Sequence, residues 1–160
     1  MKAGILTVSD GVARGEREDA SGDVLEELLS SEGFTVERDV VPDDRDEISS
    51  GLSALIRRND LVLTTGGTGF GPRDVTPEAT REFMERPAPG VAEAIRADAI
   101  AKTPHGLLSR GLAGIAGTTL VVNLPGSPGA CRDGFAVLRP ALGHALALLS
   151  GQSTTMHRQT

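Results

Sequence analysis

A glycine-rich segment with charged residues at its centre occupies residues 63–80 of the chain, LTTGGTGFGPRDVTPEAT. It directly follows an apolar run. The residues in it that could hold an anion are Thr65, Gly66, Gly67, Thr68 and Gly69. Glycines let a backbone approach an anion closely and turn its N–H groups toward it, and threonine hydroxyls add donors. A helix predicted to begin with Thr76 as its N-cap also favours negative charge at its first turn. The segment therefore predicts a phosphate-binding loop.

Two aspartates at predicted strand ends suggest a cation at the same place. Asp74 lies inside the glycine-rich segment, where it would repel a phosphate unless a hard cation such as Mg²⁺ lay between them. Asp43 follows the second predicted strand, in VVPDDRDE. Its neighbour Asp44 is best explained as a helix cap, whereas Asp43 fits either a capping partner or a metal ligand. If Asp43 is a ligand, two carboxylates converging with phosphates would need a divalent metal to neutralise them.

Two common nucleotide motifs do not fit the glycine-rich segment. A P-loop requires Lys-Ser or Lys-Thr after its last glycine, and no glycine here is followed by that pair. The dinucleotide fingerprint would need glycine at position 72 after Gly67 and Gly69, but Pro72 occupies it. A glycine-rich turn without a ligand remains the alternative to a phosphate site.

Further polar residues lie where other predicted strands end. They are Ser9 and Asp10 after the first strand, Asp19 and Ser21 shortly beyond, and Asn123, Gly126 and Ser127 after the last strand. In open α/β sheets, ligands bind at the carboxyl ends of the strands, so these residues are candidates for the same cleft. Helix capping explains the first two pairs equally well, and a plain strand-to-helix turn explains the third group.

The elements that would position these residues alternate between strand and helix. Apolar runs predict strands at 3–8, 34–41 and 60–65, and helical periodicity predicts helices near 23–33 and 44–58. This order is typical of βαβ units with a parallel sheet.

The second half is less regular. We expect helices at 76–86 and 91–102, then two strands at 107–115 and 118–126 that form a hairpin, and a last helix at 127–151 that Pro140 breaks or restarts. The predicted fold is a three-layer α/β/α sandwich with a mostly parallel sheet and one antiparallel edge strand. Residues 1–151 form one domain, and 152–160 are expected to be a flexible tail.

Composition excludes several classes of protein. The net charge of −6 argues against a broad nucleic-acid-binding surface, and no apolar run approaches the ~20 residues that a spanning helix needs. Cys131 is the single cysteine, which rules out an intramolecular disulfide and a cysteine-built metal site. The N-terminal MKAGILTVSDG is typical of a first strand rather than a signal peptide, so we expect a cytoplasmic protein.

Together these segments closely resemble the MogA/MoaB family of molybdenum cofactor biosynthesis, which includes the G domains of gephyrin-like proteins. The matching stretches are TVSD (7–10), DASG (19–22), VPDD (41–44), residues 63–80, LLSRGLAGI (107–115) and LVVNLPGSP (120–128). They occur in the family's order and span nearly the whole chain. The segment with RDVTPE is the most specific of them.

The resemblance implies a molybdopterin adenylyltransferase, which joins ATP and molybdopterin, releases pyrophosphate and leaves a product for molybdate insertion. The family's two functional aspartates match Asp43 and Asp74, which would position Mg²⁺ directly or through bound water. The serine of its LSR motif matches Ser109. The nucleotide loop matches Gly66, Gly67, Thr68 and Gly69, and a second nucleotide-proximal turn matches Asn123, Pro125, Gly126 and Ser127.

The resemblance further implies a homotrimer or hexamer and a partner that inserts molybdate. A MoaB-type member that binds molybdopterin without transferring anything, or the equivalent step in tungsten cofactor synthesis, are the alternatives.

Overall fold

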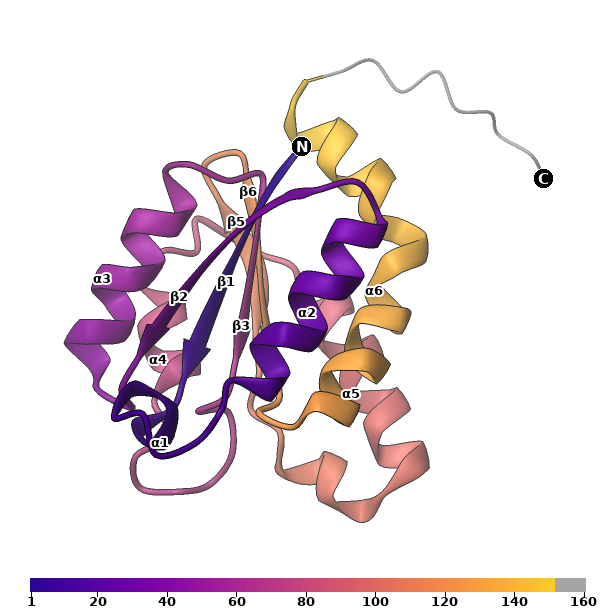
Figure 1. Cartoon of the computed structure of the whole chain (residues 1–160). Coiled ribbons are helices and arrows are strands. Elements are labelled where there is room, and N and C mark those ends of the chain that lie inside the picture. Colours follow the sequence, from indigo (N-terminus) through magenta and orange to yellow (C-terminus); the bar gives the residue numbers. More distant parts are fainter. Residues whose placement is uncertain (152–160) are drawn as a thin grey trace.

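One six-stranded sheet forms the middle layer of the protein in this computed structural model, which describes residues 1–151 (Figure 1). Its strands are β1 (Lys2–Val8), β2 (Thr35–Val41), β3 (Leu61–Thr65), β4 (Arg86–Pro87), β5 (Ala113–Ala116) and β6 (Thr119–Leu124). They lie in the order β2-β1-β3-β6-β5-β4. The pairs among β2, β1, β3 and β6 are parallel, whereas β5 runs antiparallel to both β6 and β4. The mostly parallel sheet with antiparallel pairing at one edge is confirmed.

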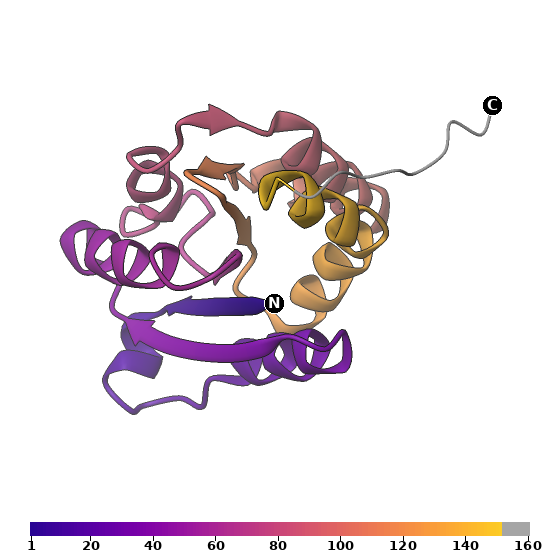
Figure 2. The ribbon, with the colours of Figure 1, turned by 90° about the horizontal axis from the view of Figure 1, so that it is seen from above.

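Helices cover both faces of this sheet. They are α1 (Asp10–Ala13), α2 (Ala20–Ser31), α3 (Arg45–Ile56), α4 (Thr76–Arg81), α5 (Pro89–Lys102), the 3₁₀ helix η1 (Pro104–Leu108) and α6 (Pro128–Leu149). Seen from above, α3 and α4 lie on one side of the sheet and α2, α5 and α6 on the other (Figure 2). The two faces carry separate hydrophobic cores, one around Phe135 and Leu25 and the other around Ile48 and Leu52.

The central strands are buried on both faces because they lie between these helical layers. Every residue of β3 and of β6 is buried, as a near-continuous apolar run predicts for a parallel strand.

Because β2, β1, β3 and β6 run parallel, their carboxyl ends lie at the same edge of the sheet. This edge carries α1 and the loop after β3 and lies at the bottom of Figure 1. We call residues 66–75 the glycine loop.

The segment 107–112 is not the strand that the sequence predicts. Leu107 and Leu108 end η1 with exposed side chains, and β5 begins only at Ala113. The Arg96 side chain donates to the carbonyls of Ser109 and Gly111, in place of the backbone N–H groups of a neighbouring strand. The short edge strand β4 was not predicted either, because two residues give no periodic signal.

The helices differ from expectation in several places. The one-turn helices α1 and η1 were not predicted, because so few residues give no periodic signal, and α2 begins at Ala20, three residues before the predicted start. Helix α4 stops at Arg81, and Thr76 is its first residue rather than its N-cap, because the Thr76 hydroxyl donates to the Gly66 carbonyl at 2.9 Å. Helix α6 runs without a break through Pro140. Leu138 before the proline and Leu142 after it are both buried against the same core, and this burial outweighs the loss of one backbone hydrogen bond.

None of the helices within residues 1–151 is both long and apolar enough to cross a membrane. The tail predicted at 152–160 lies outside the described residues.

Candidate functional site

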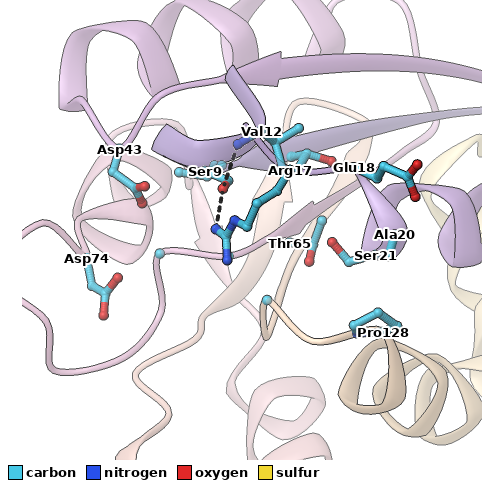
Figure 3. A pocket seen from close by; sticks show the side chains of 15 residues that line it. Ser9, Val12, Arg17, Glu18, Ala20, Ser21, Asp43, Thr65, Asp74 and Pro128 are labelled. Carbon is cyan, nitrogen blue, oxygen red and sulfur yellow. Dashed lines mark hydrogen bonds between the residues drawn. The ribbon is translucent and has the colours of Figure 1, made fainter. Parts of the chain in front are cut away.

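A cavity of about 420 Å³ opens at the carboxyl ends of β1, β2 and β3 (Figure 3). Its lining residues that could contact a ligand through polar groups are Thr7, Ser9, Arg17, Glu18, Ser21, Asp43, Thr65, Gly66, Gly67, Asp74 and Gly126. We call it the first cavity. It brings together side chains from four segments that the sequence placed separately at strand ends.

A second cavity, of about 570 Å³, lies on the other side of the glycine loop. It is lined by the loop itself, by α5 and η1, and by the turn after β6, including Thr68, Gly69, Arg96, Ser109, Pro125 and Ser127. Four residues, Gly66, Gly67, Asp74 and Gly126, line both cavities. The two cavities therefore share one wall, and that wall contains a predicted functional aspartate.

The glycine loop begins with two residues whose backbone only glycine adopts readily. Gly66 and Gly67 have φ angles of 95° and 66°. A Cβ on Gly66 would lie 2.2 Å from the carbonyl oxygen of Val8, and one on Gly67 would lie 2.2 Å from the Thr76 hydroxyl. Both positions therefore require glycine, for backbone conformation and for space.

The backbone donors of the loop differ in availability. The Gly66 N–H donates to the carbonyl of Leu124 at 3.3 Å, so it helps to close the loop instead of facing a ligand. Within residues 1–151, the N–H groups of Gly67, Thr68 and Gly69 take part in no such bond. The anion-binding capacity that the sequence predicts for 66–69 thus rests on the last three residues.

Asp43 and Asp74 both line the first cavity and lie on the same side of it in Figure 3. Desolvation raises the pKa of the partly buried Asp43 carboxyl, and the charges of Asp10 and Asp74 raise it further. Asp74 is held by the loop, because one of its oxygens accepts a hydrogen bond from the Gly71 N–H at 2.9 Å. The structure therefore brings the two predicted aspartates to one cavity.

Asp10 serves the site indirectly. Its backbone N–H donates to Asp43 at 2.9 Å, and its carboxylate accepts from the Asp43 N–H at 3.0 Å. The same carboxylate pairs with Arg73 at 2.7 Å and 3.0 Å, and this hydrogen bond lowers the pKa of Asp10. Asp10 lies outside the lining of both cavities. It connects the glycine loop to the turn that carries Asp43.

The donor set of the first cavity fits Mg²⁺. Within residues 1–151 no three His, Cys, Asp or Glu side chains gather into a metal cage. The carboxylates of Asp43 and Asp74 line this cavity, and Mg²⁺ is usually held by one or two carboxylates while it keeps several waters. Asp43 and Asp74 are the side chains that would hold it.

Arg17 is a cavity residue that the sequence reasoning missed. It is the one Lys or Arg among the lining residues of the first cavity, and its guanidinium donates to the Ser9 hydroxyl at 3.0 Å (Figure 3). The side chain lies across α1 where Gly11 leaves room, since a Cβ on Gly11 would lie 2.7 Å from the Arg17 Nε. An exposed arginine in a polar segment carries no pattern that would reveal this position.

Several predicted residues cap helices. Ser9 accepts from the Val12 N–H at the start of α1, Asp19 accepts from the Gly22 N–H in α2, and Ser127 accepts from the Ala130 N–H in α6. Ser9 and Ser127 also line a cavity, as does the buried Ser21, whereas Asp19 lines neither. Asp19 instead pairs with Arg38 at 2.6 Å and accepts from the Thr7 hydroxyl at 2.9 Å.

Asn123 lies beneath the site rather than in it. Asn123 is 4% exposed, and its side-chain amide nitrogen donates to the hydroxyls of Thr64 and Thr80, at 2.9 Å and 3.0 Å. Its side-chain oxygen accepts from the Leu112 N–H at 3.1 Å. Asn123 therefore joins β3, α4 and the segment just before β5, and it lines neither cavity.

Comparison with known proteins places this arrangement in a family. Residues 4–144 match the MoCF biosynthesis family, described as a probable molybdopterin binding domain. The molybdenum cofactor synthesis protein cinnamon of Drosophila melanogaster is 43% identical over an aligned length of 162 residues, and the alignment covers 98% of this chain. The chain spans only 27% of the length of that relative.

Shorter proteins match over nearly their full length. The molybdopterin adenylyltransferase of Helicobacter pylori strain J99 is 37% identical over 153 residues, covering 92% of this chain and 87% of that protein. The solved structure of the molybdopterin biosynthesis enzyme MoaB from Thermus thermophilus superimposes with a TM-score of 0.86 at 47% identity, covering 94% of this chain and 96% of that one. The resemblance stated from the motifs is thereby confirmed, and the chain belongs to the MogA/MoaB family of molybdenum cofactor biosynthesis proteins.

Proposed function

We propose that this protein is a molybdopterin adenylyltransferase, which transfers AMP from ATP to molybdopterin and releases pyrophosphate. The observation that carries the proposal is the pair of cavities that share Gly66, Gly67 and Asp74. A transfer between two anions requires both to be held side by side at one reacting centre. The name of the Helicobacter pylori relative supports the choice of substrates.

In the proposed reaction, an oxygen of the terminal phosphate of molybdopterin attacks the α-phosphorus of ATP. The new O–P bond forms as the bond from that phosphorus to the bridging oxygen breaks, and pyrophosphate leaves with the bonding electrons. Such transfers depend mainly on alignment and on charge stabilisation. The N–H groups of Gly67, Thr68 and Gly69 bind phosphate oxygens, and Arg17 adds a fixed positive charge.

Asp43 and Asp74 are the side chains that would hold Mg²⁺ near the substrate phosphates. When bound, this ion would supply positive charge against the phosphates and the leaving pyrophosphate. The negative charge of the two aspartates would attract the cation to this part of the first cavity.

A covalent intermediate on the protein is not needed. Cys131, in the first turn of α6, is fully buried, and burial raises the pKa of its thiol to about 11. At neutral pH it is therefore a protonated thiol that donates to the carbonyl of Pro125 at 3.1 Å, and not a nucleophile.

The direct test is to incubate the protein with molybdopterin, ATP and Mg²⁺ and to measure adenylylated pterin and pyrophosphate. We expect one pyrophosphate for each adenylylated pterin. Removing the charge with Asp74→Asn should lower kcat by about 10²–10³-fold, the range for loss of one group that stabilises transition-state charge. Glu27→Gln, an exposed carboxylate of α2 that lines neither cavity, is the matched control and should keep wild-type activity.

Two results would count against the proposal. Binding of molybdopterin and ATP without any product would favour a binding protein of the MoaB type. Wild-type turnover by Asp74→Asn would remove the proposed role of that aspartate.

A further inference from the structure

Arg110 follows Ser109, and its side chain forms hydrogen bonds with the glycine loop. Its Nε donates to the carbonyl of Gly69 at 2.8 Å, and one Nη donates to the carbonyl of Asp74 at 2.6 Å. Its backbone N–H also donates to the carbonyl of Thr68 at 2.9 Å. Arg110 thus contacts the loop on both sides of its turn at 70–73.

A guanidinium is suited to this task because its donors are fixed in one plane. It holds the two carbonyls at a set separation, which the single ammonium of lysine does not do. The other Nη pairs with Glu78 in the first turn of α4. Desolvation opposes ionisation of Glu78, but the hydrogen bond and charge of Arg110 together hold its pKa below the usual range.

Arg110 is itself held in place by a second arginine. Arg96, on α5, donates to the carbonyl of Ser109 at 2.9 Å and to that of Gly111 at 2.8 Å. These two carbonyls flank Arg110 in the chain. A continuous set of hydrogen bonds therefore runs from α5 through residues 109–111 to the glycine loop and Asp74.

Arg110 lies outside the two cavities proposed for the substrates and lines a third cavity, of about 370 Å³, with Gly69, Phe70 and Gly71. Its charge is compensated by Glu78. Its contacts on the loop are to backbone carbonyls only, including that of Asp74, whose carboxylate faces the first cavity.

We propose that Arg110 is a positioning residue, which fixes the backbone of Asp74 and the glycine loop for adenylyl transfer without contacting either substrate. The inference rests on the proposed function for its kinetic part. Its structural part, the restraint of the loop, does not depend on any activity.

The kinetic test replaces the guanidinium of Arg110 with the single ammonium of lysine, which keeps the positive charge. Arg110→Lys should lower kcat by about 10- to 100-fold, because a misplacement of about 1 Å at a reacting centre has effects of that size, while KM for ATP changes by less than about threefold. In an Asp74→Asn background the same change should cost less than about threefold, because it acts through Asp74. Arg139→Lys, an exposed arginine of α6 paired with Glu32, is the matched control and should change neither constant.

The second readout is hydrogen exchange of the loop amides in the protein without substrates. The Gly71 N–H, which donates to the Asp74 carboxylate, should exchange at least about tenfold faster in Arg110→Lys, and at the wild-type rate in Arg139→Lys. Glu78→Gln, which removes only the charge partner, should give a smaller change in the same direction. It provides the test should Arg110→Lys fail to fold.

The outcomes separate the two proposals. Faster exchange in a protein that forms no adenylylated pterin would support the restraint and refute the proposed function. Unchanged exchange, or unchanged kcat in an active enzyme, would overturn the role of Arg110. A full additional loss in the Asp74→Asn background would also overturn it, since Arg110 would then act independently of Asp74.

Discussion

Carboxylates outnumber cationic side chains around the first cavity. Glu18, Asp43 and Asp74 line it, whereas Arg17 is the one cation among its lining residues. In the proposed function, an anionic substrate would therefore depend on that arginine, on a bound cation and on backbone N–H groups. The position of Arg17 depends in turn on the absence of a side chain at Gly11.

We expect Arg17→Met to weaken the binding of Mg²⁺–ATP by about tenfold, the size expected for one lost hydrogen bond to a charged group. Gly11→Ala should weaken binding in the same direction, because its Cβ would displace the Arg17 guanidinium while keeping the charge on the protein. Titration calorimetry measures both affinities. Arg14→Met, which removes a neighbouring arginine paired with Glu16, is the control. Equal affinity for the wild type and Arg17→Met would show that Arg17 contributes no binding energy.

At the scale of the elements, α6 shows burial overriding a local signal. Its exposed Pro140 lacks the N–H that an internal helical position needs, yet the helix continues for nine residues to Leu149. The apolar residues on both sides of Pro140 pack against the core that includes Phe135.

Replacing this proline should therefore stabilise the protein. We expect Pro140→Ala to raise the free energy of unfolding by about 1–2 kcal/mol, since the helical gain of up to about 3 kcal/mol is reduced by the greater entropy of the unfolded chain. Urea unfolding with an unchanged m-value would measure it. A loss of stability would instead mean that α6 has a bend that only proline fits.

Apart from the short helix α1 and the start of α2, the first half of the fold could be predicted because its signals are local. The buried runs of β1 and β3 and the Asp44 cap of α3 are all read directly from neighbouring residues. The region around Ser109 could not be predicted in this way. Its backbone is held by Arg96 and by contacts with the glycine loop, and neither partner can be inferred from the sequence of 107–112.

The same distinction applies to the site. Asp43, Asp74 and the loop could be placed together because parallel strands end at one edge of the sheet. Asn123 follows the same rule in sequence, but its place on β6 directs the side chain into the interior between Thr64 and Thr80. Arg17 and Arg110 could not be found, because their partners become neighbours only in the folded chain.

Over the whole molecule, the sheet separates two hydrophobic cores. Ile5 belongs to the core beneath α2, α5 and α6, and Ile48 to the core beneath α3 and α4. Both side chains are fully buried. The two isoleucines belong to different clusters, and the clusters have no residue in common.

The effects of small cavities in the two cores should therefore add. Ile5→Val and Ile48→Val are each expected to lower the free energy of unfolding by about 0.5–1.5 kcal/mol. The double variant should lose the sum of the two within about 0.5 kcal/mol. Chemical denaturation of the wild type, the two single variants and the double variant measures this double-mutant cycle. A coupling well above that value would mean that the sheet transmits strain between its faces.

The wall shared by the two cavities has a consequence for what leaves the protein. A molecule that fills both cavities is bivalent, because each half raises the effective concentration of the other at its own cavity. A half that is released usually rebinds before the other half leaves, so a joined molecule has a longer residence time than either of its parts. For an enzyme with this architecture, a receiving protein that binds one half of the joined molecule would accelerate its departure.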